Sequence, residues 1–312
     1  MLTFGPIPSR RLGRSLGINN IPPKVCTYSC VYCQIGKTSN MKIQLQSFYS
    51  PSQIFYEVQE KVEKSREKGE SIDYLTFVPD GEPTLDINLG KEIKLIKSLG
   101  IKIAVITNAS LVDQKQVREN LKEVDLVSLK VDSVEEEIWR KVNHPQRSLC
   151  LKSILEGMLK FSESFRGKII TETMLIKNVN DNSQHIKKVA DFLVKLKPNR
   201  SYLSLPIRPP AEKWVQAPSE EVVNHSYYIF KEKIDKVECL IGYEGNAFAF
   251  TGEVEEDILS ITSVHPMREE ALKDFLKRAK SDWSTILKLI NKGQLVETEY
   301  EGNKFYIRKF LK

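Results

Sequence analysis

The chain has 312 residues, enough for one large domain or for one domain with a small additional module. Hydrophobic residues make up 41% of it, no apolar run is long enough to span a bilayer, and the start lacks an apolar signal segment. The net charge of +6 is compatible with an anionic partner, and the five cysteines do not form a disulfide framework, so we expect a cytoplasmic protein without a membrane partner.

Segment 4–20 contains a glycine and two prolines near its start, which argue against regular structure there. The first predicted strand covers residues 15–19. Three arginines precede this strand, namely Arg10, Arg11 and Arg14. They either bind a carboxylate or phosphate or form a solvated basic turn.

Three cysteines follow at a spacing of C-x3-C-x2-C, namely Cys26, Cys30 and Cys33. Such close spacing lets one loop hold a single soft metal centre, either zinc or an iron–sulfur cluster. A closed structural zinc site needs four ligands, and no fourth candidate is nearby in the sequence. A cubane cluster on three cysteines leaves one iron open to bind a substrate or cofactor. Cys150 and Cys239 are expected to be buried apolar residues, with a role as hydrogen donors or auxiliary ligands as the alternative.

From residue 50 onward, helical and strand patterns alternate. Ser50 is a predicted helix cap and Pro51 suits the first turn. The further predicted strands cover 74–78, 102–107, 126–132, 168–176 and 202–205, with a helix after each. Six strand–helix repeats predict a parallel α/β sheet, and the fold class expected is a partial (β/α)6 barrel. A doubly wound open sheet is the competing architecture.

Alternation along the strands places polar side chains on the face expected to line the barrel. Ser128, Lys130 and Asp132 share one face of their strand, and Arg208 follows the last strand on the polar face. A polar lumen costs stability unless its groups are paired or bind a ligand. Lys130, Asp132 and Arg208 are therefore candidate catalytic residues, with a buried Lys130–Asp132 ion pair as the structural alternative.

The cysteine spacing, with Tyr32 just before the last cysteine, resembles the signature of radical S-adenosylmethionine (radical SAM) enzymes. Gly81-Glu82-Pro83, directly after the second strand, is similar to the element with which that family holds the amino group of S-adenosylmethionine (SAM). The resemblance covers roughly residues 14–235 and points to a prokaryotic branch somewhat similar to wyosine-type tRNA-modifying enzymes.

The resemblance implies a cofactor set and a reaction. Cys26, Cys30 and Cys33 would hold a [4Fe-4S] cluster whose open iron binds SAM. Reductive cleavage would give methionine and a 5′-deoxyadenosyl radical that abstracts hydrogen from a substrate. The expected electron donor is a ferredoxin or flavodoxin. The residues implied as cofactor contacts are Tyr32, Gly81, Glu82, Pro83, Asn108 and Glu172. The structural alternatives are a turn or cap role for Asn108 and half of an internal ion pair for Glu172.

The last part of the chain is expected to differ from the barrel. Residues 1–252 are predicted to form the barrel, closed by a strand pair within 238–250. Residues 253–312 read as two helices and a hairpin, which resembles a small winged-helix module. Its basic residues are Lys292, Lys304, Arg308, Lys309 and Lys312. Such modules bind nucleic acid, bind peptides or only pack against the rest of the protein. The turn 265–268, which precedes the first helix of the module, either reaches back to the barrel or is a linker.

Three functions are carried forward from these observations. The first is a radical SAM enzyme acting on an unidentified substrate, either RNA such as tRNA or a peptide. The second is a zinc-dependent nucleic-acid-binding protein without catalysis. The third is a radical SAM activase that places a glycyl radical on a partner enzyme.

Overall fold

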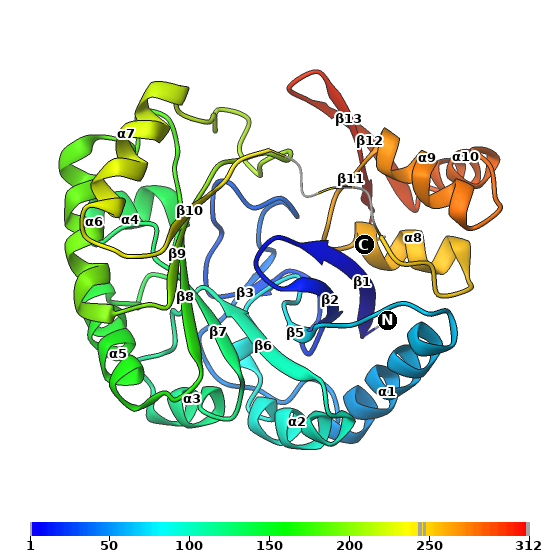
Figure 1. The fold of residues 1–312 in the computed structure, drawn as a ribbon, viewed down its shortest axis with the longest axis horizontal. Helices are drawn as coiled ribbons and strands as arrows, with labels where there is room; N and C mark the ends of the chain where they lie inside the picture. Colours follow the sequence, from blue (N-terminus) through cyan, green and yellow to red (C-terminus); the bar gives the residue numbers. More distant parts are fainter. Residues whose placement is uncertain (1, 243–244, 246–247, 310–312) are drawn as a thin grey trace.

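The computed structural model describes residues 2–242, 245 and 248–309, and an eight-stranded sheet curled into a half-barrel dominates it (Figure 1). The strands in spatial order are β1 (Thr3–Ser9), β2 (Gly13–Ile18), β5 (Tyr74–Phe77), β6 (Lys102–Thr107), β7 (Leu126–Lys130), β8 (Lys168–Met174), β9 (Arg200–Ser204) and β10 (Val237–Leu240). The helices on its outside are α1 (Pro51–Glu67), α2 (Leu89–Ile96), α3 (Lys115–Leu121), α4 (Glu136–Asn143), α5 (Leu151–Ser164), α6 (Ser183–Leu196) and α7 (Glu220–Lys231).

The order of the strands decides between the two predicted architectures. From β2 to β10 every strand pairs in parallel with the next one in the sheet. A doubly wound sheet reverses its strand order at a switch point, and this sheet does not reverse. The partial barrel is therefore confirmed, and the doubly wound alternative is wrong.

Two strands depart from the predictions. Segment 4–20 was not expected to be regular at its start, yet β1 pairs antiparallel with β2. Its prolines are tolerated because β1 is the edge strand and its register shifts between Phe4 and Ile7. At the other edge β10 pairs in parallel with β9, giving a seventh parallel strand where a strand pair was expected. Part of that expected pair, residues 243–244 and 246–247, lies outside the described residues.

Side-chain caps mark the beginning of three of the outer helices. The Ser50 hydroxyl accepts a hydrogen bond of 3.1 Å from the Gln53 backbone N–H, which caps α1 ahead of Pro51. Ser219 and Asn182 cap α7 and α6 in the same way. None of the helices in the described part of the chain is both long and apolar enough to cross a membrane.

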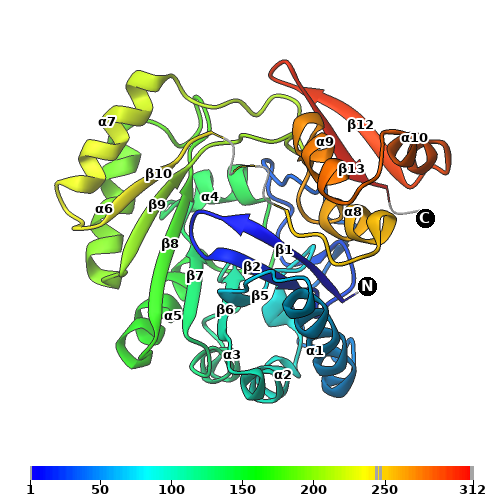
Figure 2. The same cartoon turned by 45° about the vertical axis from the view of Figure 1, so that its right-hand side comes forward.

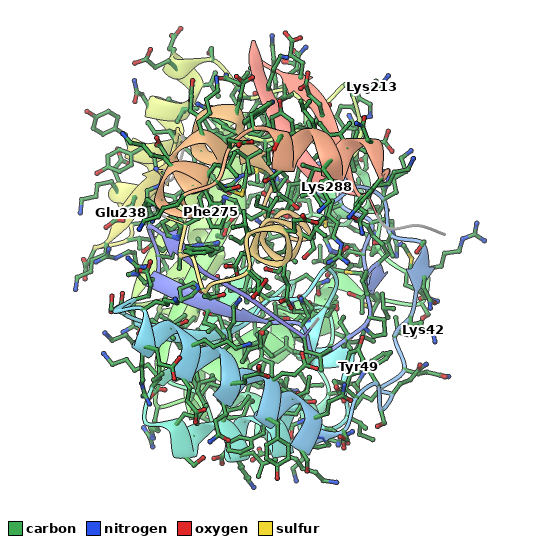
Figure 3. All side chains as sticks on the ribbon, turned by 90° about the vertical axis from the view of Figure 1, so that its right-hand side faces the viewer. Lys42, Tyr49, Lys213, Glu238, Phe275 and Lys288 are labelled. Atoms are coloured by element: carbon green, nitrogen blue, oxygen red, sulfur yellow. The ribbon has the colours of Figure 1, made fainter. Side chains whose placement is uncertain are left out.

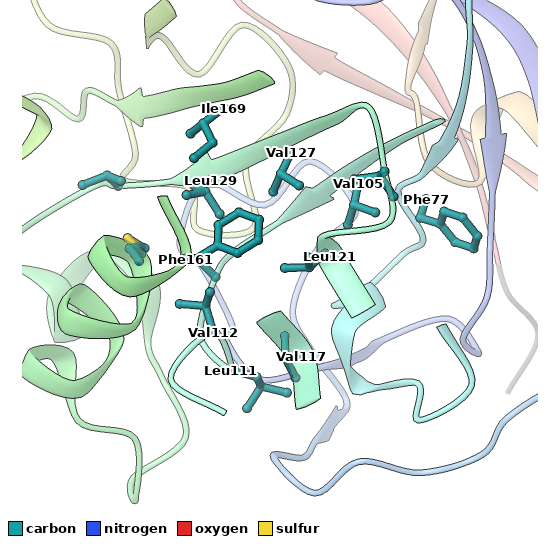
Figure 4. Close-up of a cluster of buried hydrophobic side chains, with 14 of the residues drawn as sticks. Phe77, Val105, Leu111, Val112, Val117, Leu121, Val127, Leu129, Phe161 and Ile169 are labelled. Carbon is teal, nitrogen blue, oxygen red and sulfur yellow. The ribbon is translucent and has the colours of Figure 1, made fainter. Parts of the chain in front are cut away.

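The main core lies between the sheet and its outer helices. Figure 4 shows Val127 and Leu129 of β7 pointing toward Phe161 of α5, and all three are fully buried. On the opposite face of the strands a separate small cluster contains Leu126 and Ile170, and apolar side chains such as Leu240 reach the cavity beside the polar ones. The predicted lumen is thus polar only in part.

A second, smaller core belongs to the end of the chain and lies beside β1 (Figure 2). Its elements are α8 (Val254–Thr262), β11 (Met267–Arg268), α9 (Glu269–Arg278), α10 (Ser284–Asn291), β12 (Leu295–Tyr300) and β13 (Asn303–Arg308). The two helices and the hairpin match the predicted elements, whereas a winged-helix module is not confirmed. Lys312 lies outside the described residues. We call residues 253–309 the C-terminal module.

Candidate active site

A cavity of about 340 Å³ opens at the carboxyl ends of the parallel strands, the usual place for sites in α/β barrels. Its lining includes most of the predicted site residues, namely Cys26, Cys30, Cys33, Tyr32, Gly81, Glu82, Asn108, Lys130, Glu172 and Arg208. Pro83 and Asp132 are not among the lining residues. Cys150, expected to be buried, is exposed at the N-cap of α5, so that expectation is wrong.

The three clustered cysteines lie on one loop and face the same cavity. Backbone N–H groups of Cys33 and Gly36 donate to the carbonyls of Cys30 and Cys33, at 3.0 Å each, which winds the loop tightly. Carboxamide N–H groups approach two sulfurs: Asn143 lies 3.4 Å from Cys30 Sγ and Asn108 lies 3.6 Å from Cys26 Sγ. Such donors stabilise metal-bound thiolates, so these residues fit an iron–sulfur cluster.

The environment of the free thiols opposes their ionisation. Burial, with the nearby carboxylate of Asp132, raises the pKa of Cys30 to about 12, and burial also raises the pKa of Cys26 and Cys33. A bound metal centre supplies the positive charge that converts buried thiols to thiolates. Within the described ranges, no three Cys, His, Asp or Glu side chains are grouped so as to hold a single metal ion.

Gly81 and Glu82 join the cysteine loop to the sheet. A side chain at Gly81 would place its Cβ 1.9 Å from the Val25 carbonyl oxygen, so only glycine permits this approach. The Glu82 carboxylate is buried and accepts bonds from the chain itself: at Oε1 from the Thr84 N–H and from the hydroxyls of Thr84 and Thr107, and at Oε2 from the Asn108 N–H. Pro83 begins the 3-10 turn Pro83–Leu85.

Lys130 and Glu172 form an ion pair on the cavity wall, across neighbouring strands β7 and β8. Lys130 Nζ lies 2.6 Å from Glu172 Oε1, and the guanidinium of Arg11 binds the other carboxylate oxygen. Burial alone would raise the pKa of Glu172, but Arg11 and Lys130 lower it to about 2. Lys130 therefore pairs with Glu172, and the alternative of a Lys130–Asp132 pair is wrong.

Asp132 is buried behind the cavity wall. Its Oδ1 accepts a 2.8 Å bond from the Met174 backbone N–H. Its Oδ2 accepts a 2.7 Å bond from the Asn143 carboxamide and a bond from the Tyr32 hydroxyl. The geometry makes Asp132 an anchor for Tyr32, which lies on the cysteine loop, and for Asn143, which contacts it, whereas the expected role of Asp132 was catalytic.

Arg208 connects the cysteine loop to the C-terminal module. Its guanidinium donates to Gln34 Oε1 at 3.0 Å and to His265 Nε2 at 3.1 Å. Gln34 in turn donates to the Val264 carbonyl at 2.9 Å. Burial, together with Arg208, holds the pKa of His265 well below its usual value, so its ring is neutral. The turn 265–268 does reach back to the barrel, since His265 lines the cavity.

Sequence reasoning missed three groups that the fold brings to the site. Neither Asn143 nor Gln34 belongs to a motif. Asn143 is far from the cysteine loop in the sequence, whereas Gln34 directly follows Cys33. Lys24 lies two residues before Cys26, with its Nζ 3.4 Å from Asp80 Oδ1. Burial raises the pKa of Asp80 to about 6 in spite of Lys24, which lowers it. The positions of Lys24, two residues before Cys26, and of Gln34, directly after Cys33, were the available signals.

Comparisons with known proteins agree with this geometry. A family model described as the radical SAM superfamily matches residues 20–193. The UPF0026 protein MJ1312 of Methanocaldococcus jannaschii is 50% identical over 98% of this chain and 96% of its own length. A UPF0026 protein of Helicobacter pylori strain J99 is 34% identical over 73% of each chain. A solved structure of TYW1 with a lysine-pyruvate adduct bound has a TM-score of 0.55 at 16% identity, over 71% of this chain and 74% of that one.

Proposed function

Because this chain belongs to the radical SAM superfamily and is an enzyme of that class, we propose that it cleaves SAM reductively at a [4Fe-4S] cluster held by Cys26, Cys30 and Cys33. The observation that carries the proposal is that the three thiols face one cavity together with Gly81 and the Lys130–Glu172 pair. When bound, the cluster supplies the electron that splits SAM into methionine and a 5′-deoxyadenosyl radical, which removes hydrogen from the substrate.

The surrounding residues have separate parts in this proposal. Gly81 offers a backbone surface without a side chain next to the cysteine loop, which suits the methionyl end of SAM. Glu82 accepts bonds from the Thr107 hydroxyl and the Asn108 N–H and lines the cavity, so it holds Asn108 in place and presents its carboxylate to the amino group of SAM. Tyr32, Asn108 and Glu172 line the cavity and contact the remainder of the cofactor. The cavity walls exclude water from the reacting carbon.

Arg208 and Lys130 are the residues proposed to contact the substrate. Both line the cavity, and both are fixed by neighbours: Arg208 by Gln34 and His265, and Lys130 by Glu172. Side chains held in this way bind a ligand without losing further conformational entropy. Asp132 serves the site through Tyr32 and Asn143 instead.

The two substrate classes are RNA and a peptide, and the C-terminal module does not single out RNA. Lys292 Nζ lies 3.6 Å from Glu255, and Lys304 Nζ lies 2.9 Å from Glu297, so glutamates offset these basic residues. Binding of tRNA that weakens steeply between 50 and 200 mM salt, on the order of 10³-fold for six phosphate contacts, indicates RNA. Binding of a peptide that changes little over this range of salt, without such tRNA binding, indicates a peptide substrate.

The test of the proposed reaction uses two cysteine variants. The protein is reconstituted with iron and sulfide without oxygen, then given SAM and dithionite, and 5′-deoxyadenosine is measured. We expect product and cluster absorbance from wild type and from Cys150→Ala, whose thiol is exposed and remote in sequence from the loop. Cys30→Ala should give neither. Zinc bound by wild type in place of iron, with no product, would overturn the proposal in favour of the zinc-dependent alternative.

A further inference from the structure

We propose that an acidic one-electron donor protein docks on a basic face built around the outer side of the cysteine loop. The face, called the donor face below, consists of Lys37, Met41, Lys42, Lys141, Arg147, Lys213 and Trp214. The inference rests on the proposed function, because a cluster that cleaves SAM must first be reduced by one electron. It adds the place on this chain where that electron arrives.

Three separate segments contact the cysteine loop through its backbone, and each carries a basic residue at the contacting position or next to it. The Lys42 N–H donates to the Cys26 carbonyl at 3.0 Å. The Gln146 N–H, next to Arg147, donates to the Thr27 carbonyl at 2.9 Å. These bonds place Lys42 and Arg147 within one residue of direct contacts with the loop.

The third segment follows β9. The Glu212 N–H, next to Lys213, donates to the Val31 carbonyl at 3.0 Å. The Val31 N–H donates to the Val142 carbonyl, beside Lys141, also at 3.0 Å. Figure 3 shows Lys42 and Lys213 toward the same side of the molecule. Cations from distant parts of the sequence therefore surround one loop.

The composition of the donor face suits a protein partner. Lys141, Arg147 and Lys213 are exposed, and the one acidic residue of these contacts, Glu212, binds Lys37 at 2.8 Å. Two large apolar side chains lie among the cations: Met41 is 38% exposed and Trp214 is 48% exposed. Aromatic and methionine side chains with a charged rim are typical of protein interfaces.

The position of the donor face favours an electron donor over the substrate. None of its residues is among those lining the cavity, whereas Cys26, Cys30 and Cys33 are. A substrate has to present its reacting carbon inside the cavity. A donor needs only a short path to the cluster, and the backbone contacts at Cys26 and Val31 provide one. Charge complementarity then selects an acidic donor and speeds its association at low salt.

The test compares two variants with equal changes in net charge. The first is Lys42→Glu/Arg147→Glu/Lys213→Glu. The control is Lys94→Glu/Lys160→Glu/Lys187→Glu, which reverses three exposed lysines on α2, α5 and α6. Each reconstituted protein is mixed with reduced flavodoxin, an acidic donor, at low ionic strength, and bleaching of the cluster absorbance is followed by stopped flow. The same proteins are reduced with dithionite, which needs no docking.

We expect the donor-face variant to be reduced by flavodoxin at least tenfold more slowly than the control, with the difference shrinking as salt is added. Dithionite should reduce the wild type and both variants at equal rates. Equal rates with flavodoxin would overturn the inference. So would tRNA binding that weakens in the donor-face variant while its flavodoxin rate is unchanged. If dithionite fails to reduce even the wild-type cluster, the proposed function is contradicted, and this inference fails with it.

Discussion

Asn143 is the residue through which the barrel reaches the sulfur of Cys30. Its carboxamide donates to Asp132 at 2.7 Å and to Cys30 Sγ at 3.4 Å, so the carboxylate fixes the direction of the second N–H. An N–H donor on a ligating sulfur offsets the negative charge gained when an iron–sulfur cluster is reduced. In the proposed site, Asn143 would therefore help to set how readily the cluster accepts an electron.

Replacing Asn143 by leucine should make the cluster harder to reduce. The change keeps the side-chain size and removes the N–H···S bond, so we expect a more negative midpoint potential in a redox titration followed by electron paramagnetic resonance. Asn88→Leu is the control, because Asn88 binds a serine hydroxyl and no sulfur. An unchanged potential in a variant that still holds its cluster would show that Asn143 is purely structural.

Glu172 gives the protein a pH dependence with a definite sign. Its pKa is about 2 in the folded protein, whereas the unfolded chain has an ordinary value of about 4.3. A depressed pKa contributes stability that is fully present above about pH 4.5 and is lost as the pH falls toward 2. Arg11 and Lys130 supply this stabilisation.

Glu172→Gln should lower the free energy of unfolding most at neutral pH. The gap between variant and wild type should narrow between about pH 4.5 and pH 2, because the wild type alone loses an ion-paired carboxylate there. Urea unfolding, followed by tryptophan fluorescence at a series of pH values, measures this difference in the free energy of unfolding. Glu163→Gln, at an exposed position, should leave the gap near zero throughout. A gap that stays constant with pH would contradict the assignment.

At the residue scale, sequence patterns identified side chains that belong to motifs and missed those that the fold recruits. Cys26, Cys30 and Cys33 are recognisable because one short loop carries them all. Asn143 becomes adjacent to Cys30 only through folding, across 113 residues of sequence. Lys130 was identified as a lumen residue, but its partner Glu172 lies on the next strand. Only the strand register, which sets Lys130 opposite Glu172, supplies this pairing.

The short strand β3 (Val25–Cys26) depends on one glycine. Val25 forms a parallel bridge with Gly81 and a parallel pair with Asn40 of β4 (Asn40–Met41). The cysteine loop is thereby fastened to the end of β5 at the point where no side chain fits. Backbone contacts of this kind position a metal loop more rigidly than side-chain contacts do, because they have fewer rotatable bonds.

Gly81→Ala should displace the strand that carries Cys26. Its Cβ would meet the Val25 carbonyl oxygen at 1.9 Å, a clash with backbone that cannot turn away. We expect less iron after reconstitution and a lower free energy of unfolding. Gly69→Ala is the matched control: Gly69 has a positive φ of 71°, but no neighbouring atom lies within 4 Å of the position that an alanine Cβ would take. Equal iron content in the two variants would contradict the prediction.

Element boundaries were predictable where one face of a strand is buried. The strand Lys102–Thr107 has the bounds expected, and Leu126–Lys130 ends two residues earlier than expected. The edges were less predictable, because an edge strand needs only half of its backbone bonds and tolerates proline. After Ser204 the backbone leaves the strand, so the expected alternation stops and both Leu205 and Arg208 face the cavity.

At the scale of the whole molecule, a buried ion pair fastens the C-terminal module to the barrel. Lys61 Nζ of α1 lies 2.7 Å from Asp257 Oδ1 of α8 and 2.6 Å from the Thr251 hydroxyl. Tyr300 adds a 2.8 Å bond from its hydroxyl to the Pro206 carbonyl. No sequence pattern links these residues, which explains why the sequence does not predict how the module is attached.

Lys61→Met should destabilise the protein by about 3–5 kcal/mol, because it leaves the buried Asp257 carboxylate without its cation. Hydrogen exchange should rise most in residues 253–309. The double variant Lys61→Met/Asp257→Leu removes both charges and should recover part of the loss. Recovery of the free energy of unfolding in the double variant, measured with urea, tests the ion pair itself. Hydrogen exchange that rises as much in the barrel as in residues 253–309 would contradict the anchoring role.

The bond from Gln34 to Val264 also has a consequence for how the protein is made. The two residues are 230 positions apart, so the loop that carries the cysteines is synthesised long before the segment that covers it. At elongation rates of about 5–20 residues per second the interval is roughly 10–50 s. During this time the three thiols are present in the nascent chain without the last wall of the cavity. The cysteine loop and the segment that covers it are thus completed at different times.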